Sequence, residues 1–229
     1  MTISASRPAP PAGESPAGGQ LQIDVWGDLA CPWCYVGKSR LDRAIASSPH
    51  AGAITVVPRS FELDPAMSHE VRPNLEMLSA KYGVSLAQAR AIEDKAVALA
   101  QREGLPFAVD RVVASSFDVH RVLHLAGTLG LADQLLGVLQ RTLFSGQANA
   151  YDHTVIADAA SRLGIPRHRV EEVLASDEYA GAVRADEAEA RRIGVTGVPF
   201  AVFGGRTAIP GAASAEGYAK AIEEAWSRR

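Results

Sequence analysis

The feature that most constrains this chain of 229 residues is a pair of cysteines separated by two residues, Cys31 and Cys34, the only cysteines in the sequence. They follow an apolar run over residues 21–29 that predicts a strand, and they precede a run over residues 34–47 that predicts a helix. Two intervening residues at the start of a helix bring the cysteines within the Cα separation of about 4.4–6.8 Å that a disulfide requires. The pattern therefore predicts a redox-active pair.

The two cysteines are expected to differ in reactivity. Pro32 falls at the first helical position, where its missing N–H costs nothing. Cys31 is then at the helix N-terminus, where free amides and the helix dipole favour a thiolate. We therefore expect Cys31 to be the nucleophile. Cys34, one turn into the helix, is expected to be the resolving thiol that attacks a mixed disulfide.

Metal binding is the structural alternative, since Cys-x-x-Cys pairs also hold zinc. A zinc site needs a second half, but no further cysteine exists and the six histidines are scattered. His120 and His124 are spaced four residues apart, yet no acidic partner completes an HExxH pattern. Packing or surface histidines are the favoured interpretation, and we expect neither a metal nor an organic cofactor.

Composition excludes two classes of partner. The formal net charge of −3 gives no basic surface for nucleic acid. No segment approaches the ~18 consecutive apolar residues of a membrane span. Residues 1–20 are rich in Pro, Ala, Gly and Ser and contain no apolar block typical of a secretory signal. We expect a disordered tail there and a cytoplasmic location, with the oligomeric state left open.

The rest of the chain predicts an α/β unit interrupted by helices. Residues 53–63 predict a second strand, and Pro58 within it favours an edge position. Residues 199–209 predict a β-hairpin with a two-glycine turn, followed by a helix over residues 215–227. Helical periodicity fills the interval, and Ser85 with Gln88 has capping-box form. The predicted helices there cover residues 73–81, 85–103, 115–129, 132–147, 152–163, 166–174 and 177–193.

Three motifs together resemble the DsbA family of thioredoxin-fold oxidoreductases. They are Cys31-Pro-Trp-Cys-Tyr35 on a βαβ unit, the helical insertion, and Gly194-Val-Thr-Gly-Val-Pro-Phe200 before a hairpin. The continuation to Lys38 and the segment Phe61-Glu-Leu-Asp-Pro65 resemble the FrnE-type branch. The match runs from about residue 20 to the C-terminus.

The resemblance implies a thioredoxin-like fold, α/β in class, with a large all-helical insertion. Residues 21–63 and 194–229 would form the thioredoxin-like domain, and residues 64–193 the inserted helical domain. The first strand would be internal and the second at an edge.

The resemblance also implies a second part of the site. Pro199 would be cis and lie against the cysteines, and Val198 would offer its backbone to an extended substrate. His120, followed by Arg121, matches a His-Arg pair that the branch carries near the active-site groove. Trp33 is expected either to contact substrate or to shield the sulfurs. The implied activity is disulfide exchange with protein thiols and disulfides or with a small-molecule thiol.

Two other functions stay open. Kappa-class glutathione transferases and 2-hydroxychromene-2-carboxylate isomerases share this architecture, but usually have Ser in place of the first cysteine. A binding module with a structural disulfide is the other, although so short a loop constrains the unfolded chain little. Asp28 is expected to be a solvated acid rather than the proton acceptor of Cys34, and Lys38 an exposed lysine.

Overall fold

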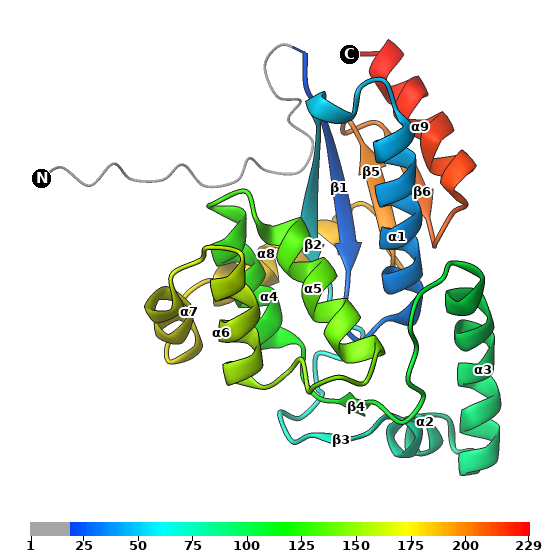
Figure 1. The fold of residues 1–229 in the computed structure, drawn as a ribbon, viewed down its shortest axis with the longest axis vertical. Helices are drawn as coiled ribbons and strands as arrows, with labels where there is room; N and C mark the ends of the chain where they lie inside the picture. Colours follow the sequence, from blue (N-terminus) through cyan, green and yellow to red (C-terminus); the bar gives the residue numbers. More distant parts are fainter. Residues whose placement is uncertain (1–18) are drawn as a thin grey trace, which may run out of the picture.

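The centre of the molecule is a four-stranded sheet, seen in a computed structural model that describes residues 19–229 (Figure 1). We predicted a disordered tail over residues 1–20, and residues 1–18 of it lie outside the described residues. The strand order is β2-β1-β5-β6. β2 is parallel to β1, β5 is antiparallel to β1, and β6 is antiparallel to β5. The strands are β1 (Leu21–Gly27), β2 (Ile54–Ser60), β5 (Phe200–Phe203) and β6 (Thr207–Pro210).

The edge position predicted for the second strand is confirmed. β2 pairs only with β1 in this sheet, and Pro58 is opposite Val25 in the register. Proline has no N–H to give to a second neighbouring strand, so an edge strand tolerates it. β1 is internal, as the resemblance implied.

Helices cover both faces of the sheet. Alternate residues of β1 point to opposite faces, so each set packs against different helices. Ile23 packs with Leu41 of α1 (Pro32–Ser47) and Ile222 of α9 (Ala215–Ser227). Trp26 faces the other way and donates from Nε1 to the Asp186 carbonyl of α8 (Ala180–Arg192), at 3.0 Å. Figure 1 shows α1 and α9 together on one side and α8 behind β2.

A block of helices lies between β2 and α8 in the sequence, and its apolar core, which includes Leu135, Leu139 and Phe144, extends to Tyr35 and Val36 of α1. A short 3₁₀ helix, Ala51–Ala53, precedes β2. The helices of the block are α2 (Asn74–Tyr82), α3 (Leu86–Arg102), α4 (Phe117–Gly127), α5 (Ala132–Phe144), α6 (His153–Arg162) and α7 (Arg167–Leu174).

One detail of the insertion differs from the expectation that it is all helical. β3 (Arg72–Pro73) and β4 (Val112–Val113) form a two-stranded antiparallel ladder. Two residues in each strand are too few to show the alternation that identifies a strand in a sequence. The ladder joins the chain before α2 to the chain before α4.

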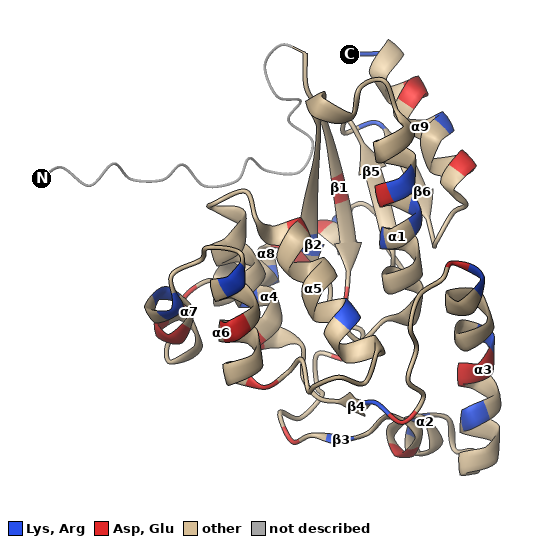
Figure 2. Cartoon of the chain, in the orientation of Figure 1, with Lys and Arg blue, Asp and Glu red and all other residues tan. Residues whose placement is uncertain are grey.

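Charged residues of both signs are interspersed on the outer helices α3, α7 and α9 (Figure 2). Within residues 19–229, no helix combines the length and the apolar character needed to cross a bilayer.

Candidate active site

The cysteine pair occupies the turn between β1 and α1. Cys31 is the N-cap of α1, in extended conformation, and Pro32 is in the first turn, as predicted. The Cys31 carbonyl accepts from the amides of Cys34, at 3.1 Å, and Tyr35, at 3.2 Å. The Cys31 amide donates to the Asp28 carbonyl at 3.2 Å. These bonds fix both cysteines on the first turn of the helix.

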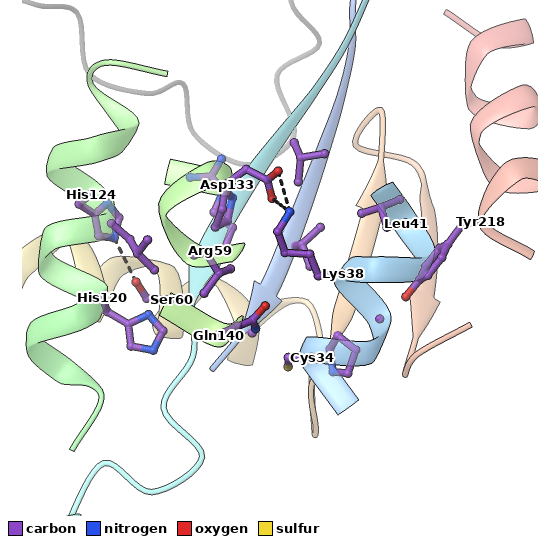
Figure 3. A pocket seen from close by; sticks show the side chains of 18 residues that line it. Cys34, Lys38, Leu41, Arg59, Ser60, His120, His124, Asp133, Gln140 and Tyr218 are labelled. Atoms are coloured by element: carbon purple, nitrogen blue, oxygen red, sulfur yellow. Dashed lines mark hydrogen bonds and ion pairs between the residues drawn. The ribbon is translucent and has the colours of Figure 1, made fainter. Parts of the chain in front are cut away.

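The two cysteines face different spaces. Both are free thiols and both are nearly buried, Cys31 being 2% and Cys34 5% exposed. Cys31 lines a groove with a volume of about 380 Å³. Cys34 lines a second cavity of about 40 Å³, here called the inner pocket, shown in Figure 3. A substrate in the groove therefore meets Cys31 and not Cys34.

The groove has an apolar wall that the insertion supplies. Tyr82 at the end of α2 and Ile92 on α3 are exposed, 56% and 40%, and both line it. Trp33, 43% exposed, lines the groove beside Cys31. Met67 and Met77 extend this wall, Lys81 and Lys95 bring positive charge to the groove, and Leu63 lines it from the segment after β2. Such a wall suits an extended chain with apolar side chains.

Val198 and Pro199 line different spaces beside the cysteine pair. The peptide bond between them is cis, the geometry that the resemblance implied. The Val198 carbonyl accepts from the Cys31 thiol, with 3.6 Å between Sγ and O. Val198 lines the groove, whereas Pro199 lines the inner pocket with Cys34. The structure thus brings Cys31, Trp33 and Val198 together along the groove.

His120 lies in the inner pocket and does not line the groove. It is 2% exposed, and its Nε2 has no hydrogen-bond partner among the described residues. Gln140, 1% exposed, has an equally unpaired Oε1 in the same pocket. His124 instead contacts the Ser60 hydroxyl and an Asp186 oxygen, each at 3.2 Å. Residues 19–229 contain no group of three or more side chains that could hold a metal ion.

Asp28 is buried, contrary to the expectation of a solvated acid, and is only 3% exposed. Its Oδ1 accepts from the Ala30 amide at 3.2 Å, and its Oδ2 from the Leu63 amide at 2.7 Å. His120 Nε2 is 3.8 Å from Oδ1. Burial alone would raise the pKa of Asp28, but His120, the Leu63 amide and the Ser116 hydroxyl together lower it. Leu63 after β2 and His120 on α4 pack against Asp28, so it is almost fully buried although it lines the groove.

Cys34 is held as a thiol at neutral pH. Burial raises its pKa well above the ordinary value, and the hydrogen bond and charge of Cys31 raise it further. A hydrogen bond from the Asp28 backbone acts in the opposite direction but is outweighed. Gly27 makes room for this sulfur, since a Cβ on Gly27 would be 3.3 Å from Cys34 Sγ.

Lys38 also differs from the expectation of an exposed lysine. Its side chain is 14% exposed and lies 3.0 Å from Asp42. It also lies 2.8 Å from Asp133, a contact that Figure 3 shows. Burial would lower the pKa of Lys38, but the two carboxylates raise it. Lys38 thereby ties α1 to α5, a role that depends on a helix 95 residues away along the chain.

A sheet of this order, with a cysteine pair at the start of α1 and a proline loop opposite, defines the class of thioredoxin-fold proteins. Within that class the chain belongs to the DSBA-like thioredoxin domain family, whose model matches residues 22–223. This is a family of thiol–disulfide oxidoreductases, and the match supports a redox enzyme.

Solved structures agree with this assignment. A probable DsbA oxidoreductase from Streptomyces coelicolor is 43% identical, with a TM-score of 0.84 over 92% of each chain. A putative protein disulfide isomerase from Nitrosomonas europaea is 16% identical, with a TM-score of 0.67 over 92% of this chain and 99% of that one. A 2-hydroxychromene-2-carboxylate isomerase is also 16% identical, with a TM-score of 0.62 over 90% and 95%. The last two share the fold alone. A comparison with curated proteins gave no match.

Proposed function

We propose that this protein exchanges disulfides through Cys31 and Cys34, with Cys31 as the nucleophile. The observation that carries the proposal is the separation of the two thiols between the groove and the inner pocket. Cys31 attacks a substrate disulfide in the groove, forming a mixed disulfide and releasing one substrate thiol. Cys34 then attacks the Cys31 sulfur, closes the internal disulfide and releases the second thiol. No metal or organic cofactor takes part in this chemistry.

The substrate is a protein thiol or disulfide, or a small-molecule thiol, bound along the groove. The Val198 backbone pairs with an extended segment of the substrate. The hydrogen bond from the Cys31 thiol to the Val198 carbonyl supports this role, because it sets that backbone beside the reacting sulfur. Trp33 offers an exposed aromatic face next to the reacting sulfur. Pro199 supports the loop from the side of Cys34.

A thiol-dependent transferase or isomerase is the second candidate, favoured by the fold likeness to a 2-hydroxychromene-2-carboxylate isomerase. Such an enzyme would bind a small thiol where Cys31 lies. The second thiol at Cys34, one turn behind the first, supports disulfide exchange over this candidate, because a transferase has no use for a resolving thiol.

Two finer assignments accompany the proposal. The run from Cys31 to Lys38 and the segment 61–65 support membership of the FrnE-type branch. A cytoplasmic location is supported by cysteine usage, because both cysteines belong to the reactive motif and neither is spare for a structural disulfide. Fractionation of cells that express the full chain tests the location.

Redox titration of the Cys31–Cys34 couple, together with an insulin-reduction assay, tests the function. We expect a two-electron couple in the wild type and reduction of insulin that Cys31→Ser abolishes. A pair that never forms an internal disulfide, combined with transfer of glutathione to an organic electrophile, would favour the second candidate.

A further inference from the structure

The inner pocket is lined by two buried side chains that each have a polar atom without a hydrogen-bond partner among residues 19–229. The atoms are His120 Nε2 on α4 and Oε1 of Gln140 on α5, and the Cys34 thiol lines the same pocket. Figure 3 shows Gln140 between His120 and Cys34. Buried polar atoms are costly to leave unpaired, and a volume of about 40 Å³ has room for a water molecule. The pocket therefore has both the space and the polar groups for a proton transfer next to Cys34.

Asp28 connects this pocket to the substrate groove. Asp28 itself lines the groove, and His120 lines the inner pocket. The two side chains are each almost fully buried, with 3.8 Å between Asp28 Oδ1 and His120 Nε2. The pair thus spans the wall between the space where Cys34 loses its proton and the space where the substrate leaves.

We propose that His120 and Asp28 form a proton relay for the resolving step, with His120 as the proton acceptor and Asp28 as its counter-ion, an inference that rests on the proposed disulfide exchange. The Cys34 sulfur attacks the Cys31 sulfur of the mixed disulfide, and its proton passes to His120 through the pocket. The Asp28 carboxylate, with Oδ1 3.8 Å from Nε2, stabilises the imidazolium that forms. The bond between Cys31 and the substrate sulfur breaks, and the substrate leaves as a thiolate that takes up a proton from water in the groove. The cysteine pair is oxidised, the substrate is reduced, and the imidazolium later returns its proton to water.

The need for a relay follows from the burial of Cys34, whose raised pKa keeps it a thiol and a poor nucleophile. An imidazole accepts and releases protons near neutral pH, which suits the task. Other titratable groups also face the relay. Glu62, after β2, is paired with Arg184, and Tyr151, before α6, is a phenol whose raised pKa keeps it neutral.

The far end of the inner pocket holds charged groups that are already engaged with one another. Lys38 is bound by Asp133, and Arg59 is bound by Asp24. His124 contacts Ser60 and Asp186 rather than the unpaired atoms. His120 is therefore the imidazole in this pocket that is placed to serve Cys34.

The test separates the two chemical steps. Reduced protein is mixed with oxidised glutathione, quenched with acid and followed by mass spectrometry, which distinguishes the mixed disulfide from the internal disulfide. We expect His120→Gln to slow conversion of the mixed disulfide at least about tenfold at pH 7, with Asp28→Asn acting in the same direction. The deficit should shrink as the pH rises, because hydroxide then removes the Cys34 proton. The attack of Cys31, measured in a Cys34→Ser background, should be unchanged by His120→Gln.

His124→Gln is the matched control, since it removes an imidazole one turn further along α4 and should resolve at the wild-type rate. The relay is refuted if His120→Gln resolves within tenfold of the wild type, if the deficit is independent of pH, or if His124→Gln matches it. An equal slowing of the attack step would also refute it, since that indicates a structural role. If wild-type protein forms no mixed disulfide at all, the proposed function itself fails instead.

Discussion

Cys31 and Cys34 are one helical turn apart, yet they are in different chemical surroundings. Cys31 shares the groove with Trp33 and Val198, whereas Cys34 shares the inner pocket with His120 and Pro199. Sequence spacing predicts the order of the two roles because helix geometry alone places Cys31 at the N-cap. It does not predict the pocket behind Cys34, which helices from the insertion complete.

The difference between the thiols predicts selective alkylation. In reduced protein at neutral pH, Cys31 should react with iodoacetamide much faster than Cys34, because burial raises the pKa of Cys34 well above its ordinary value. Cys34→Ser should accordingly accumulate long-lived mixed disulfides in non-reducing pull-downs, and Cys31→Ser almost none. Peptide mapping by mass spectrometry measures the alkylation. Equal labelling of the two cysteines would reverse or remove the assignment.

The burial of Asp28 could not be predicted from the sequence. A carboxylate just beyond a strand end resembles a surface acid, and nothing nearby in the sequence marks it as buried. Its burial comes from Leu63 after β2 and from His120 on α4, 35 and 92 residues further along the chain. The exposure of Tyr82 and Ile92 in the groove could not be predicted for the opposite reason. An exposed apolar residue on a helix has the same local sequence pattern as a core residue.

At the scale of elements, α1 is pressed closely against the proline loop. A Cβ on Gly37 would be 3.1 Å from Pro199 Cγ and 3.4 Å from Ala212 Cβ. The strands, the edge position of β2 and the capping box at Ser85 follow from local patterns and are confirmed. The two-glycine turn predicted for the hairpin is wrong, because β5 and β6 are joined by three residues, 204–206. The ladder of β3 and β4 has no such pattern.

Gly37→Ala should therefore impair both stability and exchange. A helix interior gains about 1 kcal/mol from Gly to Ala, but overpacking costs about 1–3 kcal/mol, so we expect a net loss of about 1 kcal/mol. Exchange with oxidised glutathione should slow, because Pro199, which lines the inner pocket with Cys34, is displaced. Gly181→Ala in α8 is the matched control, since nothing lies within 4 Å of its added Cβ, and it should stabilise the protein. Urea unfolding measures both, and a stabilised Gly37→Ala would contradict the packing argument.

Helix α3 is attached to α1 by ion pairs. Glu103, at the C-cap of α3, accepts from Arg40 at 2.7 Å and also from Arg43. Burial alone would raise the pKa of Glu103, but hydrogen bonds from both guanidiniums lower it below 4.5. Its contribution to stability is therefore present above pH 4.5 and is lost as the pH falls through the folded-state pKa.

Glu103→Gln should lower the free energy of unfolding at pH 7 by about 1–2 kcal/mol, since two charged hydrogen bonds are weakened. The difference from wild type should shrink as the pH falls below 4.5. Unfolding curves in urea at several pH values measure it. A difference that stays constant down to pH 3 would show that the carboxylate charge is not the cause.

At the scale of the whole molecule, a buried ion network joins α8 to the sheet. Arg59 of β2 donates to Asp24 of β1 at 2.7 Å and lies 3.4 Å from Asp186 of α8. Burial raises the pKa of Asp24 more than Arg59 lowers it.

The division of the chain into a thioredoxin-like domain, residues 21–63 and 194–229, and an inserted domain, residues 64–193, stays a prediction. Helix α8 belongs to the inserted range but packs on the sheet of the thioredoxin-like domain.

Arg59→Met should destabilise the protein by about 3–5 kcal/mol, because it leaves two buried carboxylates without their shared cation. Arg192→Leu, which breaks an exposed pair with Glu189, is the control and should change stability by no more than about 0.5 kcal/mol. Thermal and urea unfolding measure both variants. A small loss in Arg59→Met would mean that the network does not hold α8 to the sheet.

The groove combines surfaces from two sources, and this arrangement separates reactivity from recognition. Its reactive floor comes from the start of α1 and the Val198 loop, whereas one wall comes from the hairpin of α2 and α3. No residue of that hairpin lines the inner pocket described around Cys34. We therefore expect exchange of residues 74–102 in a designed chimaera to change which substrates bind in the groove while leaving the surroundings of Cys34 as they are.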